Sequence, residues 1–530
     1  MKLFKKILVC TLVLSMVLAL FACTGGNNEG GFVRDKNTLN VLVFDGGYGI
    51  EYIKALEEAF EAEYPGINVV VEKTDLLQEI RSQVESGRYV ADIIITSSNY
   101  TNFGAKGFVH DISDVYTSYP FGETDKTVGE KLGEAADACE FDGKYYQLPV
   151  YTGSTGILYN KVYLDAIYGE GGYDLPLTSN QLVAMCNDIK NKGAWSFVYT
   201  NSTEAEYPIW LRDIWTAQYL GYDEYMNFHS LKYTDADGVV KTATTAKEFT
   251  DAYYTARESA LVPLASVLSN KLGMAPASCS SMSFSQAQAY FVGYTAQTDV
   301  KVINGHKGAA FMINGDWLWS EIQRYQEVVE VDVRFMRTPL NSSIIDKLST
   351  VNSEEQLVEC VKYIDSVIDG TEGTRPTYLS DADYATLLEA RRMVWTTHSQ
   401  QIATVPSNCS DLGVAKDFLK FMASDSSALA YSDALNGMTS MFNTEICAEN
   451  KLTPFAQSVN EALHADPIRV TGITSPYVAY GSLNFFRYYY FTQALYESGN
   501  PEQTAQEILA WNADNTKTTW NDIINSYQPN

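Results

Sequence analysis

The stretch from Gly143 to Lys161, GKYYQLPVYTGSTGILYNK, constrains the fold more than any other part of the chain. Pro149 interrupts a β-rich run, and Gly153 and Gly156 separate it from a second strand signal at residues 157–159. Proline lacks an amide donor and fixes its own φ, so it ends or edges a strand, whereas glycine supplies the free dihedrals that a crossing segment needs. The pattern therefore favours a hinge that leaves one domain and enters another. An ordinary strand, loop and strand within one domain is the alternative.

The size and charge of the chain narrow the classes of protein that it can belong to. With 530 residues it is too long for one hydrophobic core, so two domains or more are expected. Its hydrophobic content of 46% excludes a disordered chain, and its formal net charge of −27 disfavours binding to nucleic acid or to an anionic lipid surface. No nucleic-acid partner is predicted.

The N-terminal segment has the pattern of an export signal. Three lysines within the first six residues precede an apolar run over residues 7–20, and Leu-Phe-Ala stands immediately before Cys23. This arrangement resembles the bacterial lipobox. The resemblance implies a lipoprotein signal peptide over residues 1–22, lipid on Cys23 at the extracytoplasmic face of the cell membrane, and a flexible tether over residues 23–37. A plain secretory signal with a coincidental cysteine is the alternative.

Residues 39–96 alternate between apolar strands and amphipathic helices in the order β-α-β-α-β. In open α/β sheets, ligands bind beyond the carboxyl ends of the strands, which here are the loops 45–49 and 97–101. These loops and the strand end before them supply the first candidate ligand-binding residues, Phe44, Asp45, Tyr48, Ser98 and Asn99.

Signals for a cofactor, a metal or a catalytic centre are weak. Gly47-Tyr48-Gly49 imitates a dinucleotide fingerprint, but Tyr52 replaces the third glycine. The five histidines are scattered, and the six cysteines beyond Cys23 are widely spaced without a C-x-x-C pair. We therefore expect no cofactor, no metal and no catalytic residues. One or two disulfides are left open, and most of these cysteines are expected to be small buried residues.

Several segments together resemble one family, the bacterial extracellular solute-binding proteins of the sugar-transport type. The matching patterns are G-K-x-Y-x-x-P and Tyr-Asn-Lys within residues 143–161, A-D-I-I at 91–94 followed by GFVHDI at 107–112, GAAFMINGDWLW at 308–319, and LGVAKDFLKFMAS at 412–424. The family's usual Trp and Glu after Thr178 are absent, because Ser179 and Gln181 stand there. Residues 195–300 and 340–392 match poorly, and the second of these looks like an insertion.

The resemblance implies a two-domain fold of the periplasmic-binding-protein type (type II). Each lobe is expected to be a mixed, mostly parallel sheet with flanking helices, and the ligand cleft lies between the lobes. The implied N-terminal lobe comprises residues 38–148 and 393–435, and the C-terminal lobe comprises 149–392 and 436–530. Trp317 becomes the platform for a sugar ring. The further implied site residues are Tyr151, Asn314, Asp316 and Trp395.

The function implied by the resemblance is capture of a carbohydrate, chosen here as an oligosaccharide because of the Trp turn and the many aromatic residues. The partners would be the ligand, the permease subunits of an ABC importer and, through the lipid, the membrane; the protein itself is expected to be a monomer and not an enzyme. An extracellular carbohydrate-active hydrolase and a binding protein for a non-sugar polar solute are the alternatives.

Overall fold

The computed structural model describes residues 36–88, 91–96, 103–104, 106–137, 139–201, 207–463, 467–470 and 489–527. The predicted signal peptide, Cys23 and the candidates Ser98 and Asn99 lie outside these residues. Among the described helices, none is long and apolar enough to span a membrane.

One mixed sheet of eight strands organises the molecule, in the order β11-β6-β13-β3-β1-β2, with β12 also paired to β6 and β14 to β13. Its strands are β1 Thr38–Phe44, β2 Asn68–Thr74, β3 Ile93–Thr96, β6 Leu148–Asn160, β11 Phe311–Gly315, β12 Val333–Met336, β13 Met393–Thr404 and β14 Ile468–Val470. The remaining strands form three hairpins, β4 Glu140–Phe141 with β5 Lys144–Tyr145, β7 Lys232–Thr234 with β8 Val240–Thr242, and β9 Val302–Ile303 with β10 His306–Lys307.

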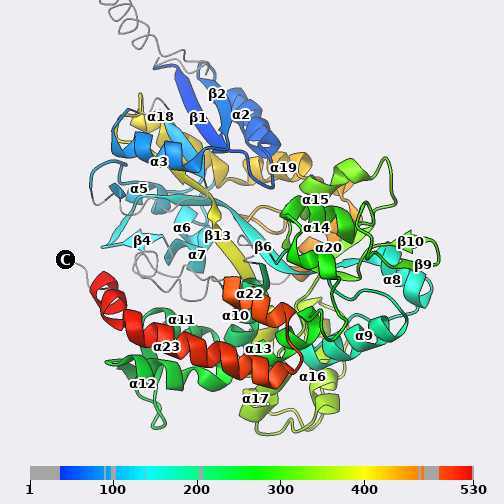
Figure 1. Ribbon diagram of the computed structural model, residues 1–530. Helices are drawn as coiled ribbons and strands as arrows, with labels where there is room; N and C mark the ends of the chain where they lie inside the picture. The colour runs from blue at the N-terminus through cyan, green and yellow to red at the C-terminus, as the bar shows by residue number, and fades with distance from the viewer. Residues whose placement is uncertain are drawn as a thin grey trace, which may run out of the picture.

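Helices cover the sheet and extend well beyond it (Figure 1). In the first half of the chain they are α2 Glu51–Glu63, α3 Leu77–Glu85, α5 Ser113–Tyr116, α6 Val128–Leu132, α7 Glu134–Asp137, α8 Lys161–Tyr168, α9 Ser179–Asn191, α10 Tyr207–Leu220, α11 Tyr222–His229, α12 Ala246–Ala252 and α13 Tyr254–Leu268. In the second half they are α14 Phe284–Phe291, α15 Leu318–Ile322, α16 Glu354–Ile368, α17 Asp381–Arg392, α18 Leu412–Met422, α19 Asp425–Ala434, α20 Pro454–Ala462, α22 Tyr489–Tyr496 and α23 Pro501–Tyr527.

The predicted β-α-β pattern over residues 39–96 is confirmed. Strands β2 and β3 flank β1, and both pair with it in parallel. The four residues of β3 are all buried, as expected of a parallel strand covered on both faces. Helix α2 buries its apolar stripe, which includes Ile53, Leu56 and Phe60, in the main core. We call this part, with the helices α18 and α19 that pack near α2, the β1–β3 half.

The segment over residues 143–161 is not interrupted as the sequence predicts. One strand, β6, runs from Leu148 to Asn160 straight through Pro149 and both glycines. The expected break is absent because β13 pairs with residues 148–155 of β6, and β11 and β12 pair with its later residues, so neighbouring strands hold the whole length extended. In Figure 1, β6 and β13 run through the centre of the molecule, next to the β1–β3 half. We call the part around β11 and β12, which pair with the later residues of β6, the β11–β12 half.

The pairing directions correct one detail of the predicted fold. The α/β class holds, and the strands β1 to β3 are parallel, but β11, β12 and β13 all pair with β6 in the antiparallel direction. A sheet that is mostly parallel is therefore wrong for the β11–β12 half. The long β6 strand reaches into both halves, and its partners there return alongside it instead of repeating the β-α-β pattern.

Residues 340–392 have a core of their own. Leu357, Ile364 and Leu387 belong to a hydrophobic cluster that is separate from the main core and lies between α16 and α17. This separate cluster fits the predicted insertion. The six cysteines beyond Cys23 are free thiols, four of them buried, so the disulfides that the sequence left open are absent.

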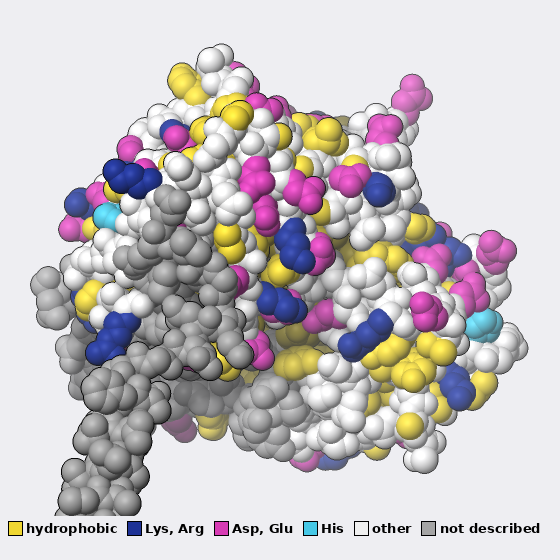
Figure 2. All heavy atoms as spheres, turned by 90° about the horizontal axis from the view of Figure 1, so that it is seen from above, with side chains coloured by type: hydrophobic (Ala, Val, Ile, Leu, Met, Phe, Trp, Pro, Cys, Tyr) yellow, Lys and Arg dark blue, Asp and Glu magenta, His cyan; other side chains and the backbone are white. Residues whose placement is uncertain are grey.

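On the described part of the face seen from above in Figure 2, acidic and basic side chains are interspersed.

The packing of β6 makes a testable prediction for Gly156. A Cβ atom added there would lie 2.9 Å from Cζ of the buried Phe335, so Gly156→Ala should lower the free energy of unfolding by about 1–3 kcal/mol through overpacking. In the matched control Gly499→Ala, the nearest atom to the added carbon is 3.9 Å away, and a change within about 0.5 kcal/mol is expected. Urea unfolding measures both values; equal effects would contradict the packing role.

Candidate functional site

Two loops from opposite halves of the molecule meet at Tyr48 and Asp316. Tyr48 follows β1, and Asp316 follows β11 in the turn before α15. The Tyr48 hydroxyl donates a hydrogen bond of 2.5 Å to Asp316 Oδ1, and the backbone amide of Ser154 on β6 donates one of 2.9 Å to Asp316 Oδ2. The carboxylate is thus held between the first loop and the central strand.

Aromatic rings surround this contact. The ring of Tyr48 lies 3.8 Å from that of Tyr151 and 5.7 Å from that of Trp317, measured between centroids. On the far side Trp317 meets Trp210 edge-on at 5.7 Å. Tyr151 also stacks on Tyr431 of α19, with 5.7 Å between the centroids. Such rings present flat apolar faces with polar groups at their edges, which suits a polar ring-shaped ligand.

Two glycines allow Trp317 to occupy its place. A Cβ atom on Gly315 would lie 2.0 Å from the indole, and one on Gly47 would lie 2.5 Å from it. Separations this short exclude any side chain unless the indole shifts. Gly47 belongs to the loop after β1, and Trp317 belongs to the other half of the molecule. A side chain at position 47 would therefore push the two halves apart at this point.

Several polar atoms in this cluster are buried without a partner. The side chains of Tyr151 and Tyr431 are each 4% exposed, and their hydroxyls make no hydrogen bond among the described residues. Gln401 on β13 accepts a 2.9 Å hydrogen bond from the Tyr52 hydroxyl. A buried hydroxyl without a partner is costly, so the hydroxyls of Tyr151 and Tyr431 are well placed to form hydrogen bonds with a ligand.

Burial dominates the electrostatics of the cluster. It raises the pKa of Asp316 to about 7, although hydrogen bonds from Tyr48 and from backbone amides act in the opposite direction. The pKa of Tyr48 is also raised, first by burial and then by the neighbouring carboxylate. A carboxyl group with such a pKa changes its charge near neutral pH.

The structure brings some predicted site residues together and leaves others apart. Tyr48, Tyr151, Asp316 and Trp317 form the cluster just described. The other described candidates make different contacts: Phe44 is half-buried at the end of β1, and Asp45 forms an ion pair with Lys73 at 2.6 Å. The buried Asn314 accepts a hydrogen bond from the amide of Gly315, and the ring of Trp395 meets that of Tyr225.

Four members of the cluster, Tyr52, Trp210, Gln401 and Tyr431, are not among the predicted site residues. In the sequence, Tyr52 stands out only because it breaks a nucleotide fingerprint, and Trp210 and Gln401 belong to no pattern that predicts a site. Tyr431 is one of 36 tyrosines in the chain and stands in no recognisable motif. Only the folding of α19 against α2 brings it to the site.

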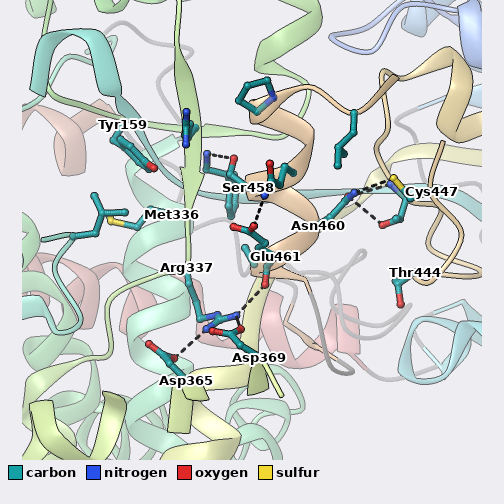
Figure 3. A pocket seen from close by; sticks show the side chains of 18 of the residues that line it. Tyr159, Met336, Arg337, Asp365, Asp369, Thr444, Cys447, Ser458, Asn460 and Glu461 are labelled. Carbon is teal, nitrogen blue, oxygen red and sulfur yellow. Dashed lines mark hydrogen bonds and ion pairs between the residues drawn. The ribbon is translucent and has the colours of Figure 1, made fainter. Parts of the chain in front are cut away.

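A separate cavity of about 830 Å³ lies in the β11–β12 half, between β12, α16 and α20. Arg337 points across it toward Asp365 and Asp369, with Glu461 and Asn460 of α20 on the other side (Figure 3). Arg337 donates to both aspartates and to the carbonyl of Glu461 at 2.8–3.1 Å. The arginines that line this cavity, Arg334, Arg337 and Arg391, are already paired with aspartates, so it is a weaker candidate than the cluster at Asp316. Among the described residues, no group of three or more metal-ligating side chains was found.

Comparison with known sequences identifies the family. The sequence model of the bacterial extracellular solute-binding proteins matches residues 55–324, a range that contains Tyr151 and the turn with Asp316 and Trp317 but begins after Tyr48. This chain belongs to the bacterial extracellular solute-binding proteins. A curated relative, the diacetylchitobiose-binding protein NgcE of Streptomyces coelicolor, is 22% identical over 193 residues, which are 35% of this chain and 39% of the relative.

Solved structures show the same fold as this solute-binding protein. The solute receptor AcbH, described as preferring β-D-galactopyranose exclusively, superposes with a TM-score of 0.57 at 14% identity, covering 91% of this chain and 100% of the other. RafE in complex with raffinose gives 0.53 at 15%, covering 90% and 99%, and apo RafE from Streptococcus pneumoniae gives 0.55 at 14%, covering 91% and 99%. Identities this low establish the two-lobe fold alone. The predicted family and fold class are confirmed.

The raised pKa of Asp316 predicts a pH-dependent stability. A carboxyl group whose pKa rises on folding stabilises the fold below its unfolded value, near pH 4, and this contribution is lost as the pH rises through about 7. Relative to the permanently neutral Asp316→Asn variant, wild type should therefore lose up to about 4 kcal/mol of unfolding free energy between about pH 4 and pH 8.

Chemical denaturation at several pH values measures this difference. Burial also raises the pKa of Glu321 to about 7, but that group is present in both proteins and cancels. Asp125→Asn, at an exposed position, is the matched control and should follow wild type at every pH. A difference between wild type and Asp316→Asn that does not change with pH would contradict the assigned environment.

Proposed function

We propose that this solute-binding protein captures a carbohydrate outside the cytoplasm by closing its two lobes around it, and then delivers it to the permease of an ABC importer. The observation that carries the proposal is the meeting of Tyr48 and Asp316, 268 positions apart, within a ring of tyrosine and tryptophan side chains. A sugar presents an apolar C–H face that stacks on such rings and hydroxyls that bond to carboxylate and phenol groups.

The relatives point in the same direction. One is a diacetylchitobiose-binding protein, another was solved with raffinose, and a third is described as preferring β-D-galactopyranose. We take an oligosaccharide as the ligand, because the aromatic cluster extends from Tyr431 through Tyr151, Tyr48 and Trp317 to Trp210, which is longer than one ring needs. The ligand-contacting residues would be these five together with Asp316 and Gln401.

Closure requires that the two lobes move relative to each other. We propose lobes at 38–148 with 393–435 and at 149–392 with 436–530, joined through β6 and β13. Residues 395–397 of β13 pair with β6 in one register, and the register shifts between Thr397 and Gln401 and again between Gln401 and Ile402. Such an irregularity interrupts the ladder between the halves, where a hinge would need it.

A thermal-shift screen of the chain beginning after Cys23, against mono- and oligosaccharides, amino acids and short peptides, tests the ligand class. A ligand that binds only the folded state raises the melting temperature by mass action. A sugar that raises it and is recovered unaltered supports capture and delivery. A sugar cleaved during the incubation would favour the hydrolase alternative, and a shift only with peptides or amino acids would contradict a carbohydrate ligand.

Trp317→Ala should weaken sugar binding by about 1–3 kcal/mol, because a stacked aromatic surface is lost. Trp317 is also 3% exposed and packed, so the variant should melt at a lower temperature than wild type. Trp319→Ala is the matched control, since Trp319 lies in the first turn of α15, next to Trp317, but stacks on Phe455 at 5.7 Å. Calorimetric titration should give wild-type affinity for this control; equal losses in both variants would remove Trp317 from the site.

The proposed lipid anchor predicts the location of the protein in the cell. Wild type should sediment with the membrane fraction and be released by detergent, whereas Cys23→Ser should leave it, because one amino-acid change removes the acyl chains that hold it there. Cys447→Ser is a suitable control, since this half-buried thiol donates only to the carbonyl of Gly437. A Cys23→Ser protein that stays in the membrane fraction would contradict the anchor.

A further inference from the structure

The carboxylate of Asp316 is buried without a balancing positive charge. Its side chain is 2% exposed, and it takes part in none of the ion pairs found among the described residues. The donors that reach it, the Tyr48 hydroxyl and the Ser154 amide, are both neutral. Lys73 is paired with Asp45, a residue of the same loop as Tyr48, at 2.6 Å. A buried charge in this condition is costly and favours a cation brought from outside.

The surroundings of the carboxylate also favour a cation. Tyr48, Tyr151 and Trp317 form a chain of rings beside it, and Tyr431 stacks on Tyr151. The negative potential above an aromatic face attracts ammonium groups, most strongly when water is excluded. One carboxylate beside several aromatic rings is therefore a site for a positive charge as well as for a sugar ring.

The contact between Tyr48 and Asp316 shows what a ligand would have to replace. Because the two residues come from opposite halves, a ligand that enters between them separates the hydroxyl from the carboxylate. A neutral sugar hydroxyl would restore the hydrogen bond and leave the charge unbalanced. An ammonium group would supply the hydrogen bond and the opposite charge together, which makes the interaction about twice as strong.

We infer that Asp316 is the specificity-determining residue of this site and selects a sugar that carries a free, protonated amino group over its neutral and N-acetylated counterparts. The inference rests on the proposed function, because it names the class of carbohydrate that the same site takes. An N-acetyl group would bring bulk and a carbonyl oxygen toward the carboxylate, and the like partial charges would repel.

Three β-1,4-linked disaccharides that differ only at the second carbon of each ring test the inference. Chitobiose carries amino groups there, diacetylchitobiose carries acetamido groups, and cellobiose carries hydroxyls. Calorimetric titration of wild type at about pH 7.5, above the pKa of about 7 at Asp316 and just below the value of about 7.7–8.0 of a free α-amino group, should give an affinity for chitobiose that is about tenfold or more higher than for the other two. In Asp316→Asn the three affinities should lie within about threefold of one another.

The outcomes distinguish a failure of this inference from a failure of the proposed carbohydrate capture. Binding of cellobiose or diacetylchitobiose as tightly as chitobiose would overturn the inference and leave carbohydrate capture in place. Tight binding of tetramethylammonium, a cation without a sugar ring, to the exclusion of all three disaccharides would overturn both. The comparison of the three disaccharides on wild type tests the inference even if Asp316→Asn folds poorly. If Asp316→Asn unfolds cooperatively and still prefers chitobiose, another residue makes the selection.

Discussion

The antiparallel pairing of β6 with β13 is the constraint on which the rest of the structure depends. Each strand has 12 or 13 residues, which is about twice the usual length, and each therefore reaches into both halves of the molecule. The side chains of Tyr151 on β6 and Gln401 on β13 and the backbone amide of Ser154 on β6 all contribute to the candidate site. The two halves thus share their central strands, and the site lies where the shared strands pass from one half to the other.

The cluster around Asp316 balances two costs. With the two loops in contact, the carboxylate is sheltered from water and keeps only neutral donors; a hydrogen bond to a charged group contributes about 1.5–3 kcal/mol, which is small beside the desolvation of the charge. The pKa of Asp316 is raised because these hydrogen bonds do not compensate for the desolvation of the charged carboxylate. The polar interactions between the two halves therefore stabilise their contact only weakly. A ligand whose donors bind the carboxylate more strongly than the Tyr48 hydroxyl does can displace that hydroxyl.

The sequence predicted the parts of the fold that local periodicity governs. These parts depend on residues that are close together in the sequence, and the structure contains them. They are the apolar runs of β1 and β3, the amphipathic stripe of α2 and the turn at Asp316 and Trp317. The direction of pairing in the β11–β12 half was not predictable in this way, because it depends on which strands become neighbours of β6. Tyr431 and Gln401 were missed for the same reason, since their contacts join residues hundreds of positions apart or on separate elements.

Glycine is where reasoning from local sequence and from packing diverge most. Gly156 was interpreted as a source of backbone freedom, yet it lies in regular strand, and its missing side chain makes room for Phe335. Gly47 and Gly315 leave room for Trp317 in the same way, one from each half. A conformational role is visible in the sequence because it concerns one residue, whereas a role in packing depends on a partner that only the fold supplies. Because Gly47 and Gly315 have no Cβ atom, the indole of Trp317 fits between them and the two halves can approach each other closely.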